Sequence, residues 1–211
     1  MAYWLQMRTE AELAALQTRQ VGNACTFHVI AAALRLLLDY QIDPDELSME
    51  MDRLWWRGRF MRVFPGWAVT PRMQVGVVKH LSNTRKLMVE AELRRGNPQA
   101  LLDLLSNPEN RIIPLITMVW LWGQAPPIYF ASTTLNFNQT KAPGGHSMIL
   151  AAYDPDHWAE DQFPTPWGFI NPWMADAVHL FWMRDSDFRS AWRFSLPGMI
   201  PNPLVLVSPQ Y

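Results

Sequence analysis

The first half of the chain is organised in blocks whose apolar residues recur at helical spacing. A lead-in over residues 9–20 is amphipathic and begins with Thr9 and Glu12, a capping-box pair. From Ala24 to Asp39 the chain is apolar on nearly all sides and rich in helix-forming residues. This stretch is predicted to be a buried central helix.

Three further helices are predicted from a polar residue followed by proline. Proline is favoured at the first position of a helix, because the N–H that it lacks has no partner there. These helices are expected over residues 43–56, 70–80 and 97–106.

The second half of the chain changes to short apolar or alternating runs bounded by Pro, Gly and Asp, which are typical of strands. The runs cover Arg111–Trp122, His146–Tyr153, Trp167–Asn171 and Leu204–Ser208. Because the helices come first and the strands later, without regular alternation, the pattern predicts an α+β fold with one antiparallel sheet. The long polar stretch 123–145 is expected to be a functional loop.

Length and composition limit the size of the protein and its classes of partner. A chain of 211 residues, 49% of them hydrophobic, suits a single domain over residues 1–211, with a helical half over about 1–108 and a sheet half over about 109–211. The net charge of -1, without a basic stripe, disfavours nucleic acids and membranes as partners. The longest apolar run is too short to span a bilayer, and no targeting segment is evident.

Eleven tryptophans are many for this length and are expected to enrich the core. The pair Trp55-Trp56 is interpreted as a helix end that packs on the core rather than as a platform for nucleic-acid bases. The acidic residues and His157 of segment 154–161 are interpreted as a solvated turn rather than a metal site.

Cys25 is the single cysteine of the chain, which excludes an intramolecular disulfide and a zinc site with several cysteines. A lone thiol fits a reducing compartment, so a cytoplasmic location is expected. Cys25 also begins the predicted central helix, where unpaired N–H groups and a partial positive charge stabilise a thiolate and lower its pKa. It is therefore a candidate nucleophile, although a free cysteine is often only a small buried hydrophobe.

His146 is the candidate general base. It opens a predicted strand directly after Gly144 and Gly145, which permit the close approach of another segment. Asn171 ends the next predicted strand, and an amide oxygen there is suited to fix the tautomer of an imidazole, with Trp173 shielding the bond from water. The structural alternatives are a capping histidine and a turn-forming Asn-Pro.

Gln20 lies shortly before Cys25 and is the candidate donor to an oxyanion, together with the Cys25 backbone N–H. Gln17 and Asn23 are alternatives for the same role. His28 stands three residues after Cys25 on the predicted helix and is expected to point into the core.

Taken in this order, the residues resemble the papain-like cysteine peptidase superfamily, and in particular its bacterial branch of double-glycine, bacteriocin-processing peptidases. The resemblance covers about residues 17–195. Its segments are Gln20-Val-Gly-Asn-Ala-Cys25, Arg111-Ile-Ile-Pro-Leu-Ile, Gly145-His146-Ser-Met-Ile-Leu and Ile170-Asn171-Pro172-Trp173.

The resemblance implies a papain-like fold in which the central nucleophile helix packs on an antiparallel sheet. It also implies a thiol hydrolase that cleaves a peptide or protein substrate, or a related amide, through Cys25, His146 and Asn171 with Gln20 at the oxyanion. No metal or organic cofactor is required by that chemistry.

Two positions depart from the family pattern. Thr26 stands where glycine is common and adds bulk beside the nucleophile, and Asn171 stands where aspartate is frequent. Thr26 motivates a second hypothesis, a catalytically inactive papain-like module that binds a peptide or partner protein. A third hypothesis keeps the triad in a transglutaminase or acyltransferase, since both reactions pass through the same acyl-enzyme.

Overall fold

The structure is a computed structural model that describes residues 1–121, 125–130, 133–136, 143–159, 163–173, 178–193 and 200–210. Within these residues the fold is α+β, as predicted, with helices that flank an antiparallel sheet. The helices are η1 (Leu5–Met7, a 3-10 turn), α1 (Glu10–Ala14), α2 (Cys25–Leu38), α3 (Pro44–Trp56), α4 (Pro71–Arg85), α5 (Pro98–Ser106) and α6 (Asp185–Arg193).

The main sheet has the strand order β2-β11-β3-β6-β9-β10-β4-β5, and β1 also pairs with β6. A separate hairpin joins β7 to β8. The strands are β1 (Tyr3–Trp4), β2 (Val89–Arg95), β3 (Ile113–Trp120), β4 (Pro127–Phe130), β5 (Thr133–Asn136), β6 (Gly144–Tyr153), β7 (Trp158–Ala159), β8 (Phe163–Pro164), β9 (Trp167–Ile170), β10 (Phe181–Met183) and β11 (Pro203–Pro209).

The predicted helix starts are confirmed by their caps. The side chains of Asp43, Thr70 and Asn97 each accept a backbone N–H in the first turn of α3, α4 and α5. Thr9 forms the predicted capping box of α1, although that helix ends early, at Ala14. The central helix α2 lies within its predicted bounds, and α4 runs past the predicted end to Arg85.

The four predicted strands are neighbours in the sheet, in the order β11-β3-β6-β9. The first half is not wholly helical, because it contains β1, which pairs with β6, and β2, which pairs along its whole length with β11. The stretch 123–145 is not a plain loop either. It contains β4 and β5, and residues 123–124, 131–132 and 137–142 lie outside the described residues.

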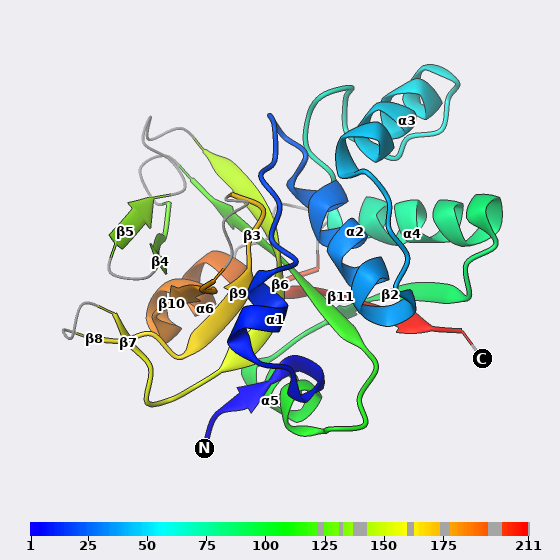
Figure 1. Cartoon of the computed structure of the whole chain (residues 1–211). Helices are drawn as coiled ribbons and strands as arrows, with labels where there is room; N and C mark the ends of the chain where they lie inside the picture. Colours follow the sequence, from blue (N-terminus) through cyan, green and yellow to red (C-terminus); the bar gives the residue numbers. More distant parts are fainter. Residues whose placement is uncertain are drawn as a thin grey trace.

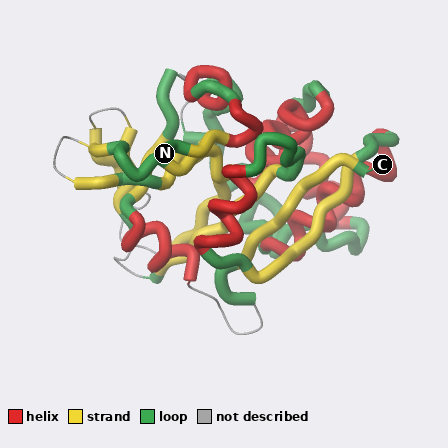
Figure 2. Tube along the Cα trace, turned by 90° about the horizontal axis from the view of Figure 1, so that it is seen from below, coloured by secondary structure: helices red, strands yellow, loops and turns green. Residues whose placement is uncertain are grey.

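Helices cover both faces of the sheet (Figure 1). On one face α2 contacts β3, β6 and β11, and α4 contacts β2 and β11. On the other face α6 lays Phe188 against Trp167 and Phe169 of β9. The paired strands are seen side by side from below in Figure 2. Successive residues of a strand point to opposite faces, so β6 presents alternate side chains to α2 and to the α6 side.

Tryptophans only partly follow the expectation of a Trp-rich core. Trp167 and Trp192 are among the largest fully buried side chains. The interpretation of Trp55-Trp56 as a helix end packed on the core is wrong, because the side chain of Trp56 is 74% exposed. Among the described residues, no helix is both long and apolar enough to cross a membrane.

Candidate active site

Cys25 is the first residue of α2, and the preceding turn is shaped by Gly22 at a φ of 61°. The residue is half-buried, and its sulfur interacts with the backbone and side chains of Ser147 and Thr26. Burial raises the pKa of the Cys25 thiol, and these hydrogen bonds offset the rise only in part. The prediction of a lowered pKa is therefore wrong, because desolvation of the thiolate outweighs the groups that favour it.

A buried polar cluster lies beneath the thiol, between α2, α4, β3 and β6. The amide nitrogen Nε2 of Gln74 is 2.9 Å from the hydroxyls of both Thr117 and Ser147, and 3.3 Å from Oγ1 of Thr26. Thr26 and Ser147 also bond to each other at 3.2 Å. The hydroxyl of Thr26 thus joins this cluster, and the side chain is buried rather than standing on the surface beside Cys25.

His146 and Asn171 form a direct hydrogen bond. The distance between Nε2 of His146 and Oδ1 of Asn171 is 2.8 Å, and both side chains are buried. An amide oxygen only accepts, so Nε2 carries the proton and Nδ1 carries the lone pair of the neutral ring. Burial lowers the pKa of His146 to about 4, although the bond to Asn171 acts in the opposite sense. The ring is therefore neutral at pH 7.

The indole of Trp173 lies against the imidazole of His146, with ring centroids 5.3 Å apart. The position fits the predicted shielding of the His146–Asn171 bond, since an apolar ring beside a hydrogen bond keeps water from competing for it.

Strand register explains why these side chains meet. Ile149 of β6 pairs with Ile170 of β9, which sets Asn171 opposite Met148 and on the same face as His146. The glycines before His146 also lie in close packing, which excludes a Cβ atom at Gly144 more strongly than at Gly145. A Cβ atom on Gly144 would lie 2.7 Å from the Trp120 ring, and one on Gly145 would lie 3.2 Å from the Met118 carbonyl oxygen. This agrees with the predicted close approach of a second segment.

The start of α2 adjoins the same end of β6. Thr26 bonds to Ser147, the residue that follows His146, and the Cys25 sulfur also interacts with Ser147. The structure therefore brings His146, Asn171 and Trp173 into contact, and it places Cys25 against the residue that follows His146.

Gln20 is tied to the segment that carries Asn171. Its backbone N–H donates to the carbonyl oxygen of Pro172 at 2.7 Å, and its side-chain Nε2 donates to the carbonyl oxygen of Gly22 at 3.1 Å. A primary amide has two donors, and among the described residues the second N–H of Gln20 has no partner, so it is available to a ligand.

Gln17 and Asn23, the alternatives to Gln20, have other partners. The side chain of Gln17 accepts from the backbone N–H of Asn171 at 3.0 Å and donates to the carbonyl oxygen of His179 at 3.1 Å. It thus positions the backbone of Asn171. Asn23 donates to the carbonyl oxygen of Gly66 at 3.3 Å. Gln20 therefore remains the predicted oxyanion donor.

Arg62 is a functional candidate that sequence reasoning missed. Its side chain is 1% exposed and lies in the connection between α3 and α4. The guanidinium donates to the carbonyl oxygens of Asn23 and Trp67 at 3.0 and 2.9 Å and pairs with Asp52 at 2.9 Å. Burial lowers the pKa of the Arg62 guanidinium, and the negative charges of Asp52 and of a Cys25 thiolate act in the opposite sense. Nothing in the local sequence distinguishes this arginine from its exposed neighbours.

Three of the four other histidines have partners in the core or in neighbouring elements. His28 is buried in α2 as predicted, with Nδ1 2.6 Å from the hydroxyl of Thr18. His80 pairs with Glu50 at 2.8 Å, and His157 stacks on Trp182 with centroids 3.7 Å apart. Within the described ranges, no three His, Cys, Asp or Glu side chains are grouped as a metal site would need. Residues 160 and 161 of the acidic turn lie outside those ranges.

No family model matches this sequence, and no curated protein matches it. Functional assignment therefore depends on the chemistry of the site. A neutral imidazole whose Nδ1 carries the lone pair, an amide that holds its tautomer and a thiol at the adjoining helix N-terminus are the parts of a general base and a nucleophile.

Proposed function

We propose that the chain is a papain-like thiol hydrolase that cleaves a peptide or a related amide through an acyl-enzyme. The observation that carries the proposal is the 2.8 Å bond between Nε2 of His146 and Oδ1 of Asn171. That bond makes Nδ1 the basic nitrogen of His146, at the end of β6 where α2 begins with Cys25. A structural histidine at a strand start does not require a buried amide acceptor, an indole cover and a cysteine at the adjoining helix start.

In the proposed reaction, the Cys25 sulfur attacks the substrate carbonyl carbon while Nδ1 of His146 accepts the thiol proton. The backbone N–H of Cys25 and the side chain of Gln20 donate to the oxyanion that forms. His146 then gives its proton to the leaving amine as the C–N bond breaks. Water, deprotonated by His146, hydrolyses the thioester and regenerates the thiol. Asn171 orients the ring throughout.

The resting charges of Cys25 and His146 determine when the thiol proton moves. Since burial raises the pKa of Cys25 and lowers that of His146, thiol and imidazole are both uncharged at neutral pH. The sulfur therefore becomes nucleophilic as it attacks, rather than resting as a preformed thiolate.

Cleavage of a library of internally quenched peptides tests the proposal, with Cys25→Ala and Cys25→Ser as matched variants. The native chain should cleave members of the library and form a thioester that mass spectrometry detects on Cys25. Cys25→Ala should lose both signals. Cleavage that survives in Cys25→Ala would refute the assignment.

The raised pKa of Cys25 specifically favours a second candidate, a papain-like module that binds a peptide without cleaving it. Binding of library peptides measured by fluorescence anisotropy separates the two. A module binds peptides equally well in the native chain and in the Cys25→Ala variant, and it yields no product in either. A hydrolase yields product only with Cys25 present.

Alkylation by iodoacetamide reports on the resting state, because the chain has one cysteine. The reaction needs the thiolate, so its rate should rise with pH only above the range of a free cysteine. A rise in the alkylation rate below that range would show that the thiolate is already formed at rest. The inference that the thiol loses its proton only during attack would then be wrong.

A further inference from the structure

A cluster of aromatic side chains covers the end of α3 and the connection that follows it. We call it the aromatic tip, and it consists of Trp55, Trp56, Phe60, Phe64 and Trp67. Trp55 is at its centre, with ring centroids 4.9 Å from Trp56, 5.7 Å from Phe60 and 6.1 Å from Phe64. Phe64 and Trp67 are 5.7 Å apart. The rings therefore form one continuous apolar surface.

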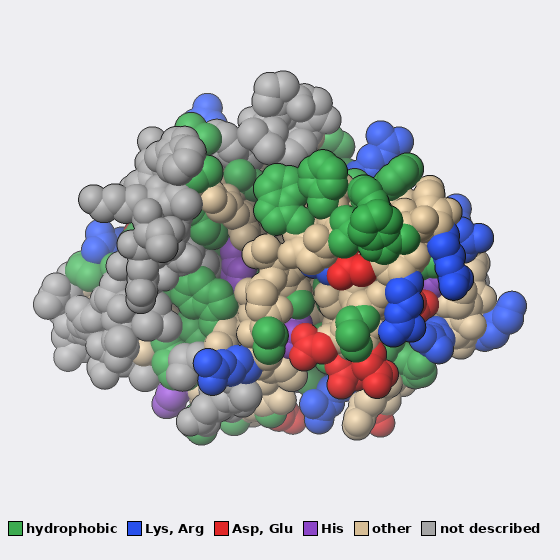
Figure 3. Space-filling view, turned by 90° about the horizontal axis from the view of Figure 1, so that it is seen from above, with side chains coloured by type: hydrophobic (Ala, Val, Ile, Leu, Met, Phe, Trp, Pro, Cys, Tyr) green, Lys and Arg blue, Asp and Glu red, His purple; other side chains and the backbone are tan. Residues whose placement is uncertain are grey.

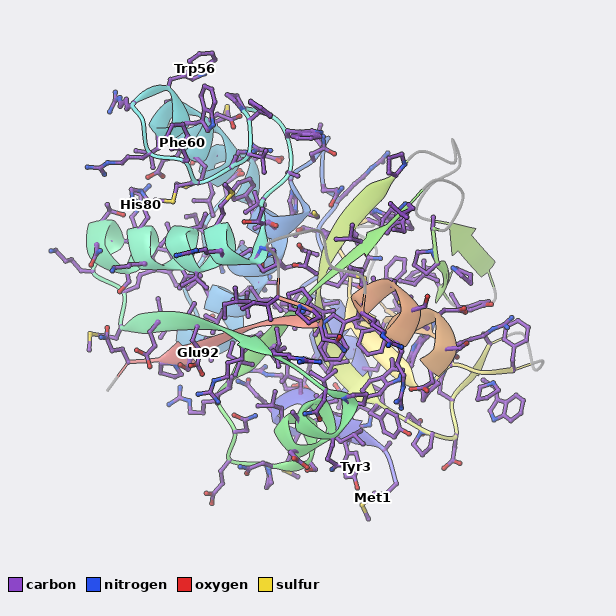
Figure 4. The ribbon with its side chains drawn as sticks, turned by 180° about the vertical axis from the view of Figure 1, so that it is seen from behind. Met1, Tyr3, Trp56, Phe60, His80 and Glu92 are labelled. Atoms are coloured by element: carbon purple, nitrogen blue, oxygen red, sulfur yellow. The ribbon has the colours of Figure 1, made fainter. Side chains whose placement is uncertain are left out.

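The aromatic tip projects from the molecule rather than lining a groove. Trp56, Phe60, Phe64 and Trp67 are 74, 62, 55 and 53% exposed, whereas side chains on the walls of a groove are partly covered by one another. Trp56 and Phe60 stand at the far end of α3, directed away from the sheet (Figure 4). Figure 3 shows hydrophobic side chains gathered over the upper face, with basic side chains at the margin.

The projection is held in place by hydrogen bonds. The indole N–H of Trp55 donates to the carbonyl oxygen of Val63 at 3.3 Å, and buried Arg62 donates to the carbonyl oxygen of Trp67. The backbone N–H of Val63 donates to the carbonyl oxygen of Ala68 at 2.9 Å. These hydrogen bonds hold the rings in their exposed positions. A contiguous exposed apolar surface of this kind marks an interaction site.

Charges along α3 are divided between its ends. The first turn carries exposed Asp45 and Glu46, while the tip carries exposed Arg53, Arg57 and Arg59. Among the described residues these three arginines form no ion pair. The net charge of the whole chain is -1 and does not reveal this local excess of positive charge. Composition alone therefore disfavoured an anionic partner.

We propose that the aromatic tip docks this protein on the surface of an anionic lipid bilayer. Projecting tryptophan and phenylalanine rings flanked by arginine match the chemistry of the membrane interface, where rings enter the acyl boundary and cations meet lipid phosphates. The proposal concerns peripheral docking and does not depend on the reaction of Cys25. The tip is linked to the start of α2 by the bonds of Asn23 to Gly66 and Arg62, so docking holds Cys25 near the lipid surface.

Flotation with vesicles of phosphatidylcholine alone, or with added phosphatidylserine, tests the proposal on the full chain. The native protein and Cys25→Ala should float equally with the anionic vesicles, less with the neutral ones, and less as salt is raised. Trp56→Ser with Phe60→Ser should weaken binding at least about tenfold. Arg57→Gln and Arg59→Gln should each weaken it by about fivefold.

Trp158→Ser is the matched control, because Trp158 is 53% exposed but lies on β7, outside the aromatic tip. It should float as the native protein does. Circular dichroism and thermal unfolding establish that each variant is folded. Failure to bind anionic vesicles, or equal binding by the Trp56/Phe60 variant, would overturn the proposal. Concentration-dependent dimers, or peptide binding lost in that variant while flotation persists, would assign the surface to a protein partner instead.

Discussion

On the sheet side of the candidate site, the imidazole of His146 is held by two paired strands, by Asn171 and by the cover of Trp173. On the helix side, the thiol of Cys25 stands at the first turn of α2, where Arg62 binds the carbonyl oxygen of Asn23. The sheet side is positioned by backbone register, which many residues share. The helix side depends on a few buried side chains, so single substitutions should disturb it more.

Burial acts on both sides but in opposite directions. It lowers the pKa of His146 and raises the pKa of Cys25, because an apolar surrounding disfavours whichever form is charged. Substitutions that each remove one supporting side chain therefore distinguish the sheet side of the candidate site from its helix side.

The largest effect is expected on the helix side, from Arg62→Met. The substitution removes the cation that pairs with Asp52 and leaves the carbonyl oxygens of Asn23 and Trp67 without this donor. The free energy of unfolding, measured with urea, should fall by about 4 kcal/mol. Arg57→Met, at an exposed site, should change it by about 0.5 kcal/mol or less. Similar losses of unfolding free energy in both variants would show that Arg62 does not stabilise the helix side of the candidate site.

On the sheet side, acid should destabilise the protein through His146. Its pKa is about 4 in the fold and 6.5 in the unfolded chain, so between these values the unfolded chain binds more protons. Stability from this group is complete above pH 6.5 and is lost as the pH falls to 4, by about 3 kcal/mol in total. Urea unfolding of the native chain and of His146→Gln should show this loss as the difference between their pH slopes. Equal slopes would mean that His146 is not held neutral by burial.

Asn171→Ala should impair the positioning of the His146 ring without changing the reactivity of the Cys25 thiol. Without the amide oxygen the His146 ring loses its tautomer and orientation, so kcat/KM for peptide cleavage should fall about 100-fold. The pH profile of Cys25 alkylation should stay unchanged, because the bonds to the sulfur come from Ser147 and Thr26. Asn171→Asp keeps an acceptor and should restore most of the cleavage. A shift of the alkylation profile in Asn171→Ala would show that the two sides are coupled.

Thr26→Val should change the stability much less than Arg62→Met. Loss of the hydroxyl removes bonds to Ser147 and Gln74, which still bond to each other, and should reduce the free energy of unfolding by about 1 kcal/mol. It also removes a group that lowers the pKa of the Cys25 thiol, so alkylation should require a higher pH. Thr26→Ser, which retains the hydroxyl, should alkylate as the native chain does. An identical profile in both variants would exclude a role for the cluster in tuning the thiol.

Local signals predicted much of the fold. The starts of α3, α4 and α5 follow from Asp43, Thr70 and Asn97, because a cap and the proline after it act within one turn. Strand β2 was missed because its exposed, charged face resembles a surface helix, and its pairing with distant β11 decides its conformation. Sequence placed Asn171 near His146 correctly, since strands that follow one another within the same sheet tend to pair, and β7 and β8 between them form a separate hairpin.

Local sequence signals are enough to predict α2, the glycine-led start of β6 and the Asn-Pro end of β9, because each depends on neighbours within a few residues. Contacts between distant segments bury Arg62 behind Asn23, make Gln17 rather than Gln20 the residue that holds the Asn171 backbone, and leave Trp56 exposed. Such contacts also set the direction of the pKa shift of Cys25. Desolvation depends on how many atoms from distant segments surround a group, and a local pattern does not contain that information.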